Sequence, residues 1–499
     1  MKKSIKTLSF VLIFVFLLGS STLMACTKPI SDYTPAETET SMNCVINAEI
    51  KDGCLWVTYS NDPSTPVNIG SISAETTTTT EDDSGLSFKL VSNGTYGVSA
   101  GDAKYLEEIT IPDTHNGKPV TSILDNAFEG ASNLKKITIP STITNVGNDA
   151  FKDCDKLAFN EYDNAFYLGN AENPNLILVK AKSGTITKCK IHEKTVVICD
   201  KAFNACSDLS TIAVSSAVKY IGDAAFKGCS AITEISIPSG LAYINAETFS
   251  GCSKLKKIEI PATVTTIGLS AFSNCSSLAE LTFAKDSTLT TIENSAFYGC
   301  KKLKTITFPK SLKEIGDTRA SIAKDGAFSG CSALEKVTFE SGSALTSIGS
   351  YAFNSCTKLA TIALPDSLTQ IGVSAFNSAG VTEIKIPASV TTISEKAFFN
   401  CGELKTATLN EGLTKIGPGA FGACATLNNV TIPASVQTIS KGAFDSACTA
   451  LTSVTFKKTA GWYDVAKLEA IPESSLKDTA NAAIIIKSAA YTGGFSFSQ

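Results

Sequence analysis

An Ala-Phe dipeptide, once replaced by Thr-Phe, recurs through most of this chain, and its spacing limits the possible folds more than any other feature. The commonest step is about 23 residues, as from Phe249 to Phe272. A unit this short cannot bury a core alone, so its copies must stack on one another into a solenoid. The repeated residues are Phe128, Phe151, Phe203, Phe226, Phe249, Phe272, Phe297, Phe328, Phe353, Phe376, Phe398, Phe421 and Phe444.

The unit from Cys252 to Cys275 assigns a structural role to each part of the repeat. Two isoleucines flank Glu259, an alternation that predicts a strand with one buried face. So short a strand must pair with its copies in neighbouring coils, which gives a parallel sheet with a spacing of about 4.8 Å. Pro261 has no N–H to donate and ends the strand. The phenylalanines are expected to stack as an internal spine.

The repeat, written C-x-x-L-x-x-I-x-I-P-x-x-V-x-x-I-G-x-x-A-F-x-x-C, resembles the BspA-like class of leucine-rich repeat found in bacterial surface proteins. The resemblance covers 86–456, and it extends to an insertion at 159–185 and to a capping segment at 457–499. It implies a curved leucine-rich-repeat solenoid, with the parallel β-sheet on the concave face and short turns or helical turns on the convex face. It also implies display at the cell surface and binding to host or microbial proteins. Within the insertion we expect a hairpin around 169–175.

The N-terminus resembles a bacterial lipoprotein signal. Three lysines precede a short apolar run at 8–18, and Leu23–Cys26 matches a lipobox. We therefore expect a signal peptide at 1–25, a lipid on Cys26 that anchors the chain to the membrane, and a place in the cell envelope on the outer surface. The alternative is an ordinary signal peptide in which Cys26 is incidental. Residues 26–85 predict a tether and a short segment with a strand at 55–59.

The chain has 16 cysteines, and eleven of them follow the repeated phenylalanine by three or four residues. Equivalent cysteines of successive coils lie near enough to bridge, but their Cβ vectors are parallel, which is poor disulfide geometry. We therefore predict reduced, buried thiols that reach a carbonyl of the adjacent coil. The eleven are Cys154, Cys206, Cys229, Cys252, Cys275, Cys300, Cys331, Cys356, Cys401, Cys424 and Cys448.

The exposed central residue of each predicted strand should form a column on the concave face of the solenoid, here called the candidate face. Threonine dominates this column, either because a β-branched side chain suits an exposed strand, or because hydroxyls and methyls form a flat surface for a protein or glycan. The residues expected to bind are Thr138, Lys190, Ser236, Glu259, Thr282, Thr307, Thr338, Lys385, Thr408 and Thr431.

Composition disfavours catalysis and nucleic-acid binding. The formal charge is −4, and the only histidines are His115 and His192, both expected in surface positions rather than as metal ligands. Because no catalytic or nucleotide-binding motif occurs in a suitable context, we predict no enzyme activity, no cofactor and no metal. Two hypotheses remain open. One is a surface lipoprotein that adheres to extracellular proteins or glycans of a host or of other bacteria, and the other is an envelope spacer without a specific ligand.

Overall fold

The computed structural model describes residues 45–51, 54–59, 62–71, 80–81, 84–91, 93–318, 326–467, 469–488 and 493–497. The chain divides into two compact units, Met1–Thr77 and Thr78–Gln499. In the first unit an antiparallel sheet contains β1 (Val45–Lys51), β2 (Cys54–Tyr59) and β3 (Asp62–Ser71), so the strand expected at 55–59 is present. The expected signal peptide and Cys26 lie outside the described residues.

The second unit begins with antiparallel pairing and then becomes a parallel solenoid. Strands β4 (Thr80–Glu81), β5 (Ser87–Leu90) and β6 (Tyr96–Ser99) form an antiparallel meander, followed by the 3₁₀ helix η2 (Gly101–Tyr105). β6 then pairs in parallel with β9 (Lys118–Ile123), and β9 also pairs antiparallel with the two-residue strand β8 (Thr114–His115). This change from antiparallel to parallel pairing marks the start of the coils.

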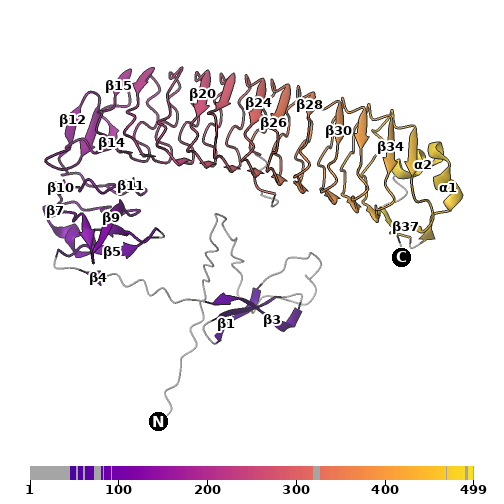
Figure 1. Cartoon of the computed structure of the whole chain (residues 1–499), viewed down its shortest axis with the longest axis horizontal. Helices are drawn as coiled ribbons and strands as arrows, with labels where there is room; N and C mark the ends of the chain where they lie inside the picture. The colour runs from indigo at the N-terminus through magenta and orange to yellow at the C-terminus, as the bar shows by residue number, and fades with distance from the viewer. Residues whose placement is uncertain are drawn as a thin grey trace, which may run out of the picture. The chain divides into compact units, whose positions relative to one another are not determined.

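The first parallel ladder contains the strand that the sequence predicts, and Figure 1 shows its labelled members β20, β24, β28, β30 and β34 following one edge of the solenoid. Its strands run in segments rather than as one sheet, and the coil at Ile235–Ile237 contributes no strand. They are β7 (Glu108–Thr110), β10 (Lys136–Thr138), β15 (Lys188–Lys190), β17 (Thr211–Ala213), β20 (Lys257–Ile260), β22 (Glu280–Phe283), β24 (Thr305–Phe308), β26 (Lys336–Phe339), β28 (Thr361–Ile362), β30 (Glu383–Lys385), β32 (Thr406–Thr408), β34 (Asn429–Ile432) and β36 (Ser453–Phe456).

A second parallel ladder, which the sequence analysis did not predict, comes from the Val-x-x-Ile part of each repeat. Its strands are mostly two residues long, with the isoleucine buried. They are β9, β11 (Asn145–Val146), β16 (Val197–Ile198), β18 (Tyr220–Ile221), β19 (Tyr243–Ile244), β21 (Thr266–Ile267), β23 (Thr291–Ile292), β25 (Glu314–Ile315), β27 (Ser347–Ile348), β29 (Gln370–Ile371), β31 (Thr392–Ile393), β33 (Lys415–Ile416) and β35 (Thr438–Ile439). The predicted solenoid with coils of about 23 residues and parallel sheets is confirmed.

The phenylalanines form the predicted internal spine. Successive rings stack with centroids 5.0–5.7 Å apart and nearly parallel planes. Most of the turns that carry the rings are tight, because the residues two before and two after the phenylalanine adopt left-handed conformations, as at Ser270 (φ 55°) and Asn274 (φ 58°) around Phe272. Gly268 lies just before this turn at negative φ, where an added Cβ would come within 2.9 Å of the Ile244 oxygen. Close packing of coils therefore explains that glycine.

The insertion forms the expected hairpin. β12 (Asn160–Tyr162), β13 (Ala165–Leu168) and β14 (Ile177–Ala181) are antiparallel neighbours, and β14 then pairs in parallel with β16 of the next coil. The insertion thus provides one layer of the solenoid that has strands but no Phe turn. The spine is interrupted there, and the buried apolar residues fall into two clusters on either side.

The C-terminal tail covers the last coil. It contains β37 (Trp462–Asp464), β38 (Glu469–Ala470), α1 (Glu473–Lys477), α2 (Thr479–Lys487) and β39 (Phe495–Phe497). β39 pairs antiparallel with β35, and Trp462 is buried with its ring 5.5 Å from that of Phe456. An antiparallel strand and two short helices therefore end the parallel stacking.

Candidate functional site

The structure places the candidate face along the first ladder as a registered column. Neighbouring strands pair Lys190 with Ala213, Glu259 with Thr282, and Lys385 with Thr408. Eight of the ten predicted residues are exposed, and Thr138 and Thr338 are half-buried. Ser236 is exposed in the coil that has no assigned first-ladder strand. The residues therefore share one surface, as their common repeat position requires.

Local hydrogen bonds account for the burial of Thr338. Its Oγ1 lies 2.7 Å from Oγ1 of Thr307, and it also donates to the Ile306 carbonyl at 3.3 Å. The other threonines on the candidate face, such as Thr282 and Thr408, make no side-chain hydrogen bond within the described part of the chain. Their hydroxyls remain available to solvent or to a partner.

Charged residues beside the candidate face are paired from coil to coil. Lys135 contacts Glu107 at 2.7 Å, and Lys257 contacts Glu234 at 3.4 Å. Lys135 also holds the pKa of Glu107 below its usual value through a hydrogen bond and its charge. Because these side chains are largely exposed, each pair adds little stability. Their main effect is that the charges beside the column partly neutralise one another.

The repeat cysteines form the predicted reduced ladder. All 13 cysteines in the solenoid coils are free and buried. Ten of them donate their thiol proton to the carbonyl of the phenylalanine one coil earlier, with Sγ–O distances of 3.0–3.3 Å. Cys206 follows the layer that lacks a Phe turn, and its Sγ lies 3.8 Å from the Ser183 oxygen instead. Burial raises the pKa of Cys275 to about 12, so its thiol is a poor nucleophile.

The two histidines have structural surroundings, and the expectation of a surface position is wrong for His115. Its ring is buried, stacked on Phe88 at 4.0 Å and edge-on to Tyr96 at 4.8 Å. His192 is half-buried, edge-on to Tyr162 at 4.8 Å. Neither histidine has ligand partners: among the described residues, no group of three or more His, Cys, Asp or Glu side chains is arranged to hold a metal ion.

The second ladder carries its own row of threonines, which the sequence analysis did not select. Their hydroxyls donate to carbonyls one coil earlier: Thr290 to Thr265 and Thr369 to Thr346, both at 3.0 Å. These bonds supplement the backbone pairing, so this threonine row has a structural role. The exception is Thr391, whose hydroxyl has no hydrogen-bond partner in the described part of the chain.

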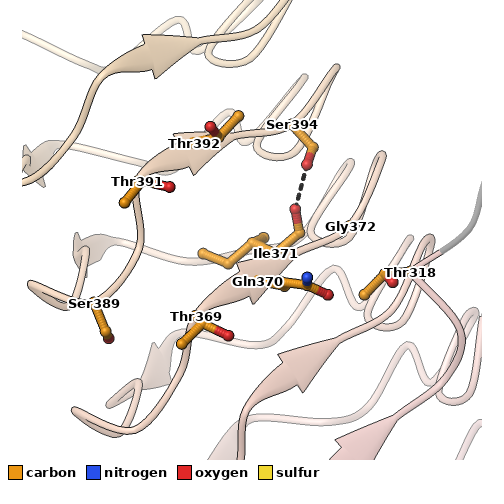
Figure 2. Close-up of a pocket in the computed structure, with 9 residues that line it drawn as sticks. All are labelled: Thr318, Thr369, Gln370, Ile371, Gly372, Ser389, Thr391, Thr392 and Ser394. Carbon is orange, nitrogen blue, oxygen red and sulfur yellow. Dashed lines mark hydrogen bonds between the residues drawn. The ribbon is translucent and has the colours of Figure 1, made fainter.

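Thr391 lies where the backbone pairing of the second ladder is interrupted, a place here called an opening. The sheet ends at β29 and a new one begins at β31, and Ser394 bridges the opening by donating from its side chain to the Ile371 carbonyl (Figure 2). A second opening lies between β18 and β19, where Nδ2 of Asn245 donates to the Ile221 carbonyl at 2.7 Å. Both bridging residues replace the usual glycine of the repeat, but Glu293 and Ser440 also replace it and keep the backbone bond, so this substitution alone does not mark an opening.

A groove of about 470 Å³ accompanies the opening at Ser394 (Figure 2). Its walls carry neutral hydroxyl and amide groups, which can exchange hydrogen bonds with a polar ligand but offer no activated nucleophile. The lining residues are Thr318, Thr369, Gln370, Ile371, Gly372, Ser389, Thr391, Thr392 and Ser394.

No helix among the described residues is long and apolar enough to cross a membrane.

Together the stacked coils, the two parallel ladders and the cysteine and phenylalanine rows define a leucine-rich repeat solenoid. The sequence matches the BspA type leucine rich repeat region in six copies, over 101–168, 181–288, 285–376 and 320–452. The chain therefore belongs to the BspA-type leucine-rich repeat family. This family is defined by a repeat and not by a catalytic domain.

Solved structures similar to this chain are bacterial leucine-rich repeat proteins. A protein from Bacteroides ovatus is 26% identical, with 74% of this chain and 87% of that chain covered and a TM-score of 0.47. A leucine rich cell surface protein from Faecalibacterium prausnitzii is also 26% identical, with 76% and 95% covered and a TM-score of 0.34. The pneumococcal vaccine antigen PcpA is 20% identical, with 77% and 82% covered and a TM-score of 0.35. A search of curated proteins found no match.

Proposed function

We propose that this protein is a bacterial surface lipoprotein that binds extracellular proteins or glycans of a host or of other bacteria through the candidate face. The observation that carries the proposal is the column itself: residues from coil after coil are in register and exposed, and most are uncharged threonines. A flat array of hydroxyls and methyls suits a broad partner surface better than a small molecule, which needs a concave pocket.

The proposed location rests on the N-terminal sequence and on the family. A lipid on Cys26 would tether the solenoid to the membrane, and residues 27–41 would act as an extended spacer. The F. prausnitzii relative is described as a cell surface protein, which agrees with this location.

A second candidate function, an envelope spacer without a specific ligand, is favoured by the paired charges beside the candidate face. In the pairs Lys135–Glu107 and Lys257–Glu234, the two charges neutralise each other across coils, so no binding partner is needed to balance them. In that case the threonines would serve only as good strand formers.

Three substitutions on the candidate face separate the two functions. Thr282→Lys, Thr307→Lys and Thr408→Lys replace exposed residues and place three positive charges on the column. We expect the triple variant to lose at least about tenfold in binding to cells or matrix, because like charges and long side chains disrupt a flat interface. The measurement is binding of the purified variant to immobilised extracellular matrix and to bacterial surface extracts.

The matched control adds the same charge elsewhere. Ser207→Lys, Thr357→Lys and Ala425→Lys change exposed turn residues that directly follow repeat cysteines. This control should bind as the unchanged protein does. If the candidate-face variant folds normally and binds as well as the control, the adhesion function is rejected in favour of the spacer.

A further inference from the structure

Where another Phe turn follows directly, the next coil covers a Phe turn in the same way. The N–H group of the phenylalanine donates to a carbonyl of the following turn, and in most coils the N–H groups two residues before and two residues after it do the same. Around Phe249, for example, Glu247, Phe249 and Gly251 donate to Leu269, Ala271 and Ser273, each at 2.8 Å. The ring is covered at the same time by the next ring of the spine, here Phe272 at 5.2 Å.

The turn at Phe151 lacks this cover. The next layer is the insertion, which contributes β13 and β14 but no Phe turn. The N–H groups of Asp149, Phe151 and Asp153 therefore have no acceptor within the described part of the chain. The Phe151 ring stacks on Phe128 at 5.7 Å on one face, and no described aromatic ring covers its other face. Phe151 is also the one spine ring, among those described, that is partly exposed.

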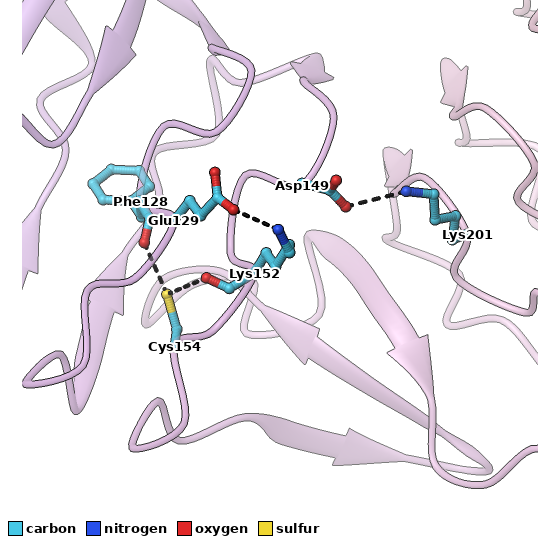
Figure 3. Close-up of polar contacts among 6 residues, drawn as sticks. All are labelled: Phe128, Glu129, Asp149, Lys152, Cys154 and Lys201. Carbon is cyan, nitrogen blue, oxygen red and sulfur yellow. Dashed lines mark hydrogen bonds and ion pairs between the residues drawn. The ribbon is translucent and has the colours of Figure 1, made fainter.

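A cavity of about 300 Å³ occupies the position of the missing turn. Phe151 and its neighbours form one wall, Cys199, Asp200 and Lys201 of the next regular coil form the opposite wall, and the insertion contributes Phe159, Val179 and Lys180. The ion pair of Asp149 with Lys201, 3.3 Å long, joins the two coils beside the cavity (Figure 3). The space is thus bounded by an uncovered aromatic ring, a row of N–H donors and charges of both signs.

The geometry of these N–H donors indicates which kind of ligand the cavity can hold. They alternate along the chain, so they match carbonyls of a second backbone rather than converge on one ion. The carboxylates of Asp149, Asp153 and Asp200 also disfavour an anion there. In the other turns of the spine up to Phe421, the same face binds a backbone turn that carries an aromatic ring. The volume lies at the lower end of the range for ligand pockets, as expected for one large side chain with a short piece of backbone.

We propose that this cavity binds a peptide turn of a partner protein, with an aromatic side chain stacked on Phe151 and backbone carbonyls accepting from Asp149, Phe151 and Asp153. The bound turn continues the coil-to-coil interface through the insertion layer, where the chain itself supplies no Phe turn. The site lies in a different part of each coil from the candidate face, so it does not depend on the function proposed for that face.

The probe is a peptide of this chain's own sequence, Gly268–Ser277, because this segment covers the equivalent face of another coil. Its Cys275 is replaced by serine to prevent oxidation, and a fluorescent label reports binding by anisotropy to the full chain in detergent. We expect saturable binding with a Kd below about 1 mM. A peptide with Phe272→Ala should bind at least about tenfold more weakly, because stacking on Phe151 is lost.

Two protein variants test the site from opposite directions. Phe151→Ala removes the stacking platform, and Val179→Trp fills the cavity while leaving Phe151 in place; each should weaken binding at least about tenfold. Phe399→Ala, which changes a partly exposed phenylalanine far along the chain, is the control and should bind normally. Circular dichroism and thermal unfolding establish that each variant is folded.

Binding that is absent up to about 5 mM peptide, or that is equal in the Val179→Trp variant and the control, would overturn the proposal. Sedimentation provides an independent check on the occupant. If the unchanged protein dimerises and the Phe151→Ala variant does not, the occupant is a second copy of this chain, and the assignment to a partner protein is wrong.

Discussion

At the level of single residues, the cysteine that ends each repeat works as a hydrogen-bond donor. The carbonyl of the repeated phenylalanine accepts the backbone N–H of the residue three positions on, as Phe249 does from Cys252 at 3.1 Å, and in most coils the thiol of the next coil is a second donor. The pairing of Cys275 with the Phe249 carbonyl at 3.2 Å is typical. Alanine occupies the same position at 131 and 379, so the solenoid tolerates the loss of single donors.

We predict that Cys275→Ala lowers the free energy of unfolding by about 1–3 kcal/mol, because it removes one of the two donors to the Phe249 carbonyl and also removes buried volume. Cys275→Ser keeps a donor in the same place and should cost less than Cys275→Ala. Chemical denaturation followed by circular dichroism measures both. Equal losses for the two variants would show that volume, and not the hydrogen bond, is the contribution of the thiol.

Asp200 combines burial with incomplete hydrogen bonding. Its Oδ1 accepts from the Asp223 N–H at 2.7 Å, whereas its buried Oδ2 has no partner among the described residues. Burial raises the pKa of Asp200 from 3.8 to about 6. Between these two values the folded state binds more protons than the unfolded state, so stability falls as pH rises through this window.

We therefore predict that Asp200→Asn stabilises the protein at pH 7 by about 1–2 kcal/mol, an amount reduced for partial solvent exposure. The gain should vanish below about pH 3, where the carboxyl is protonated in both the folded and the unfolded state. Denaturation at the two pH values tests this, with the unchanged protein as reference. A gain of the same size at both would mean that ionisation of Asp200 is not its cause.

At the level of elements, the two ladders differ in continuity. The second ladder runs unbroken from β19 to β29, whereas the first is divided between β22 and β24 over the same coils. Both ladders end together at the opening between β29 and β31. There the side chain of Ser394, instead of a backbone N–H, donates to the Ile371 carbonyl. A solenoid depends on contacts between neighbouring repeats, so such an interface is a weak point of the stack.

We predict that Ser394→Ala, which removes the bridge to the Ile371 carbonyl, accelerates amide hydrogen exchange in 366–395 by at least about fivefold. Exchange in the coils from β19 to β25 should stay unchanged. Hydrogen exchange followed by mass spectrometry measures both regions in one experiment. Ser440→Ala is the matched control, because Ser440 bonds the preceding coil through its backbone N–H. Equal acceleration in the two variants would contradict a special role for Ser394.

At the level of the whole solenoid, the insertion divides the apolar interior. One cluster of buried residues begins at Leu86 and includes Phe128, and the other includes Phe203 and extends to Phe495. The phenylalanine spine has no ring between Phe151 and Phe203 to connect them. Coupling between the two parts rests mainly on the strands β13 and β14 of the insertion.

We predict two unfolding transitions in urea, with the smaller N-terminal cluster unfolding first. Phe128→Ala should shift only the first transition and Phe376→Ala only the second, each by about 3–5 kcal/mol, because each removes one ring of the spine. Tryptophan fluorescence of Trp462 should report the second transition, and circular dichroism should report both. A single transition that moves equally in both variants would show that the insertion couples the two parts fully.

The repeat in the sequence was sufficient to predict the solenoid, the first ladder, the spine and the thiol ladder, because a residue that recurs once per coil must occupy the same environment in each. It was also sufficient for the candidate face, whose members share a repeat position. The second ladder escaped notice because strands as short as Thr266–Ile267 carry no alternation of their own. His115 was misplaced because its partners, Phe88 and Tyr96, lie in the antiparallel meander before the regular coils.

What the sequence by itself determined is the period, and with it every feature that repeats from coil to coil. Only the tertiary structure revealed the places where repetition fails: the openings bridged by Asn245 and Ser394, and the cavity beside Phe151. The physical reason is that a repeat defines which donors, acceptors and side chains each coil presents to the next one. An opening arises where the next coil does not supply the groups that would pair with them. Phe151 has the same local sequence as the other spine residues, and only the folded insertion leaves its face and its N–H donors uncovered.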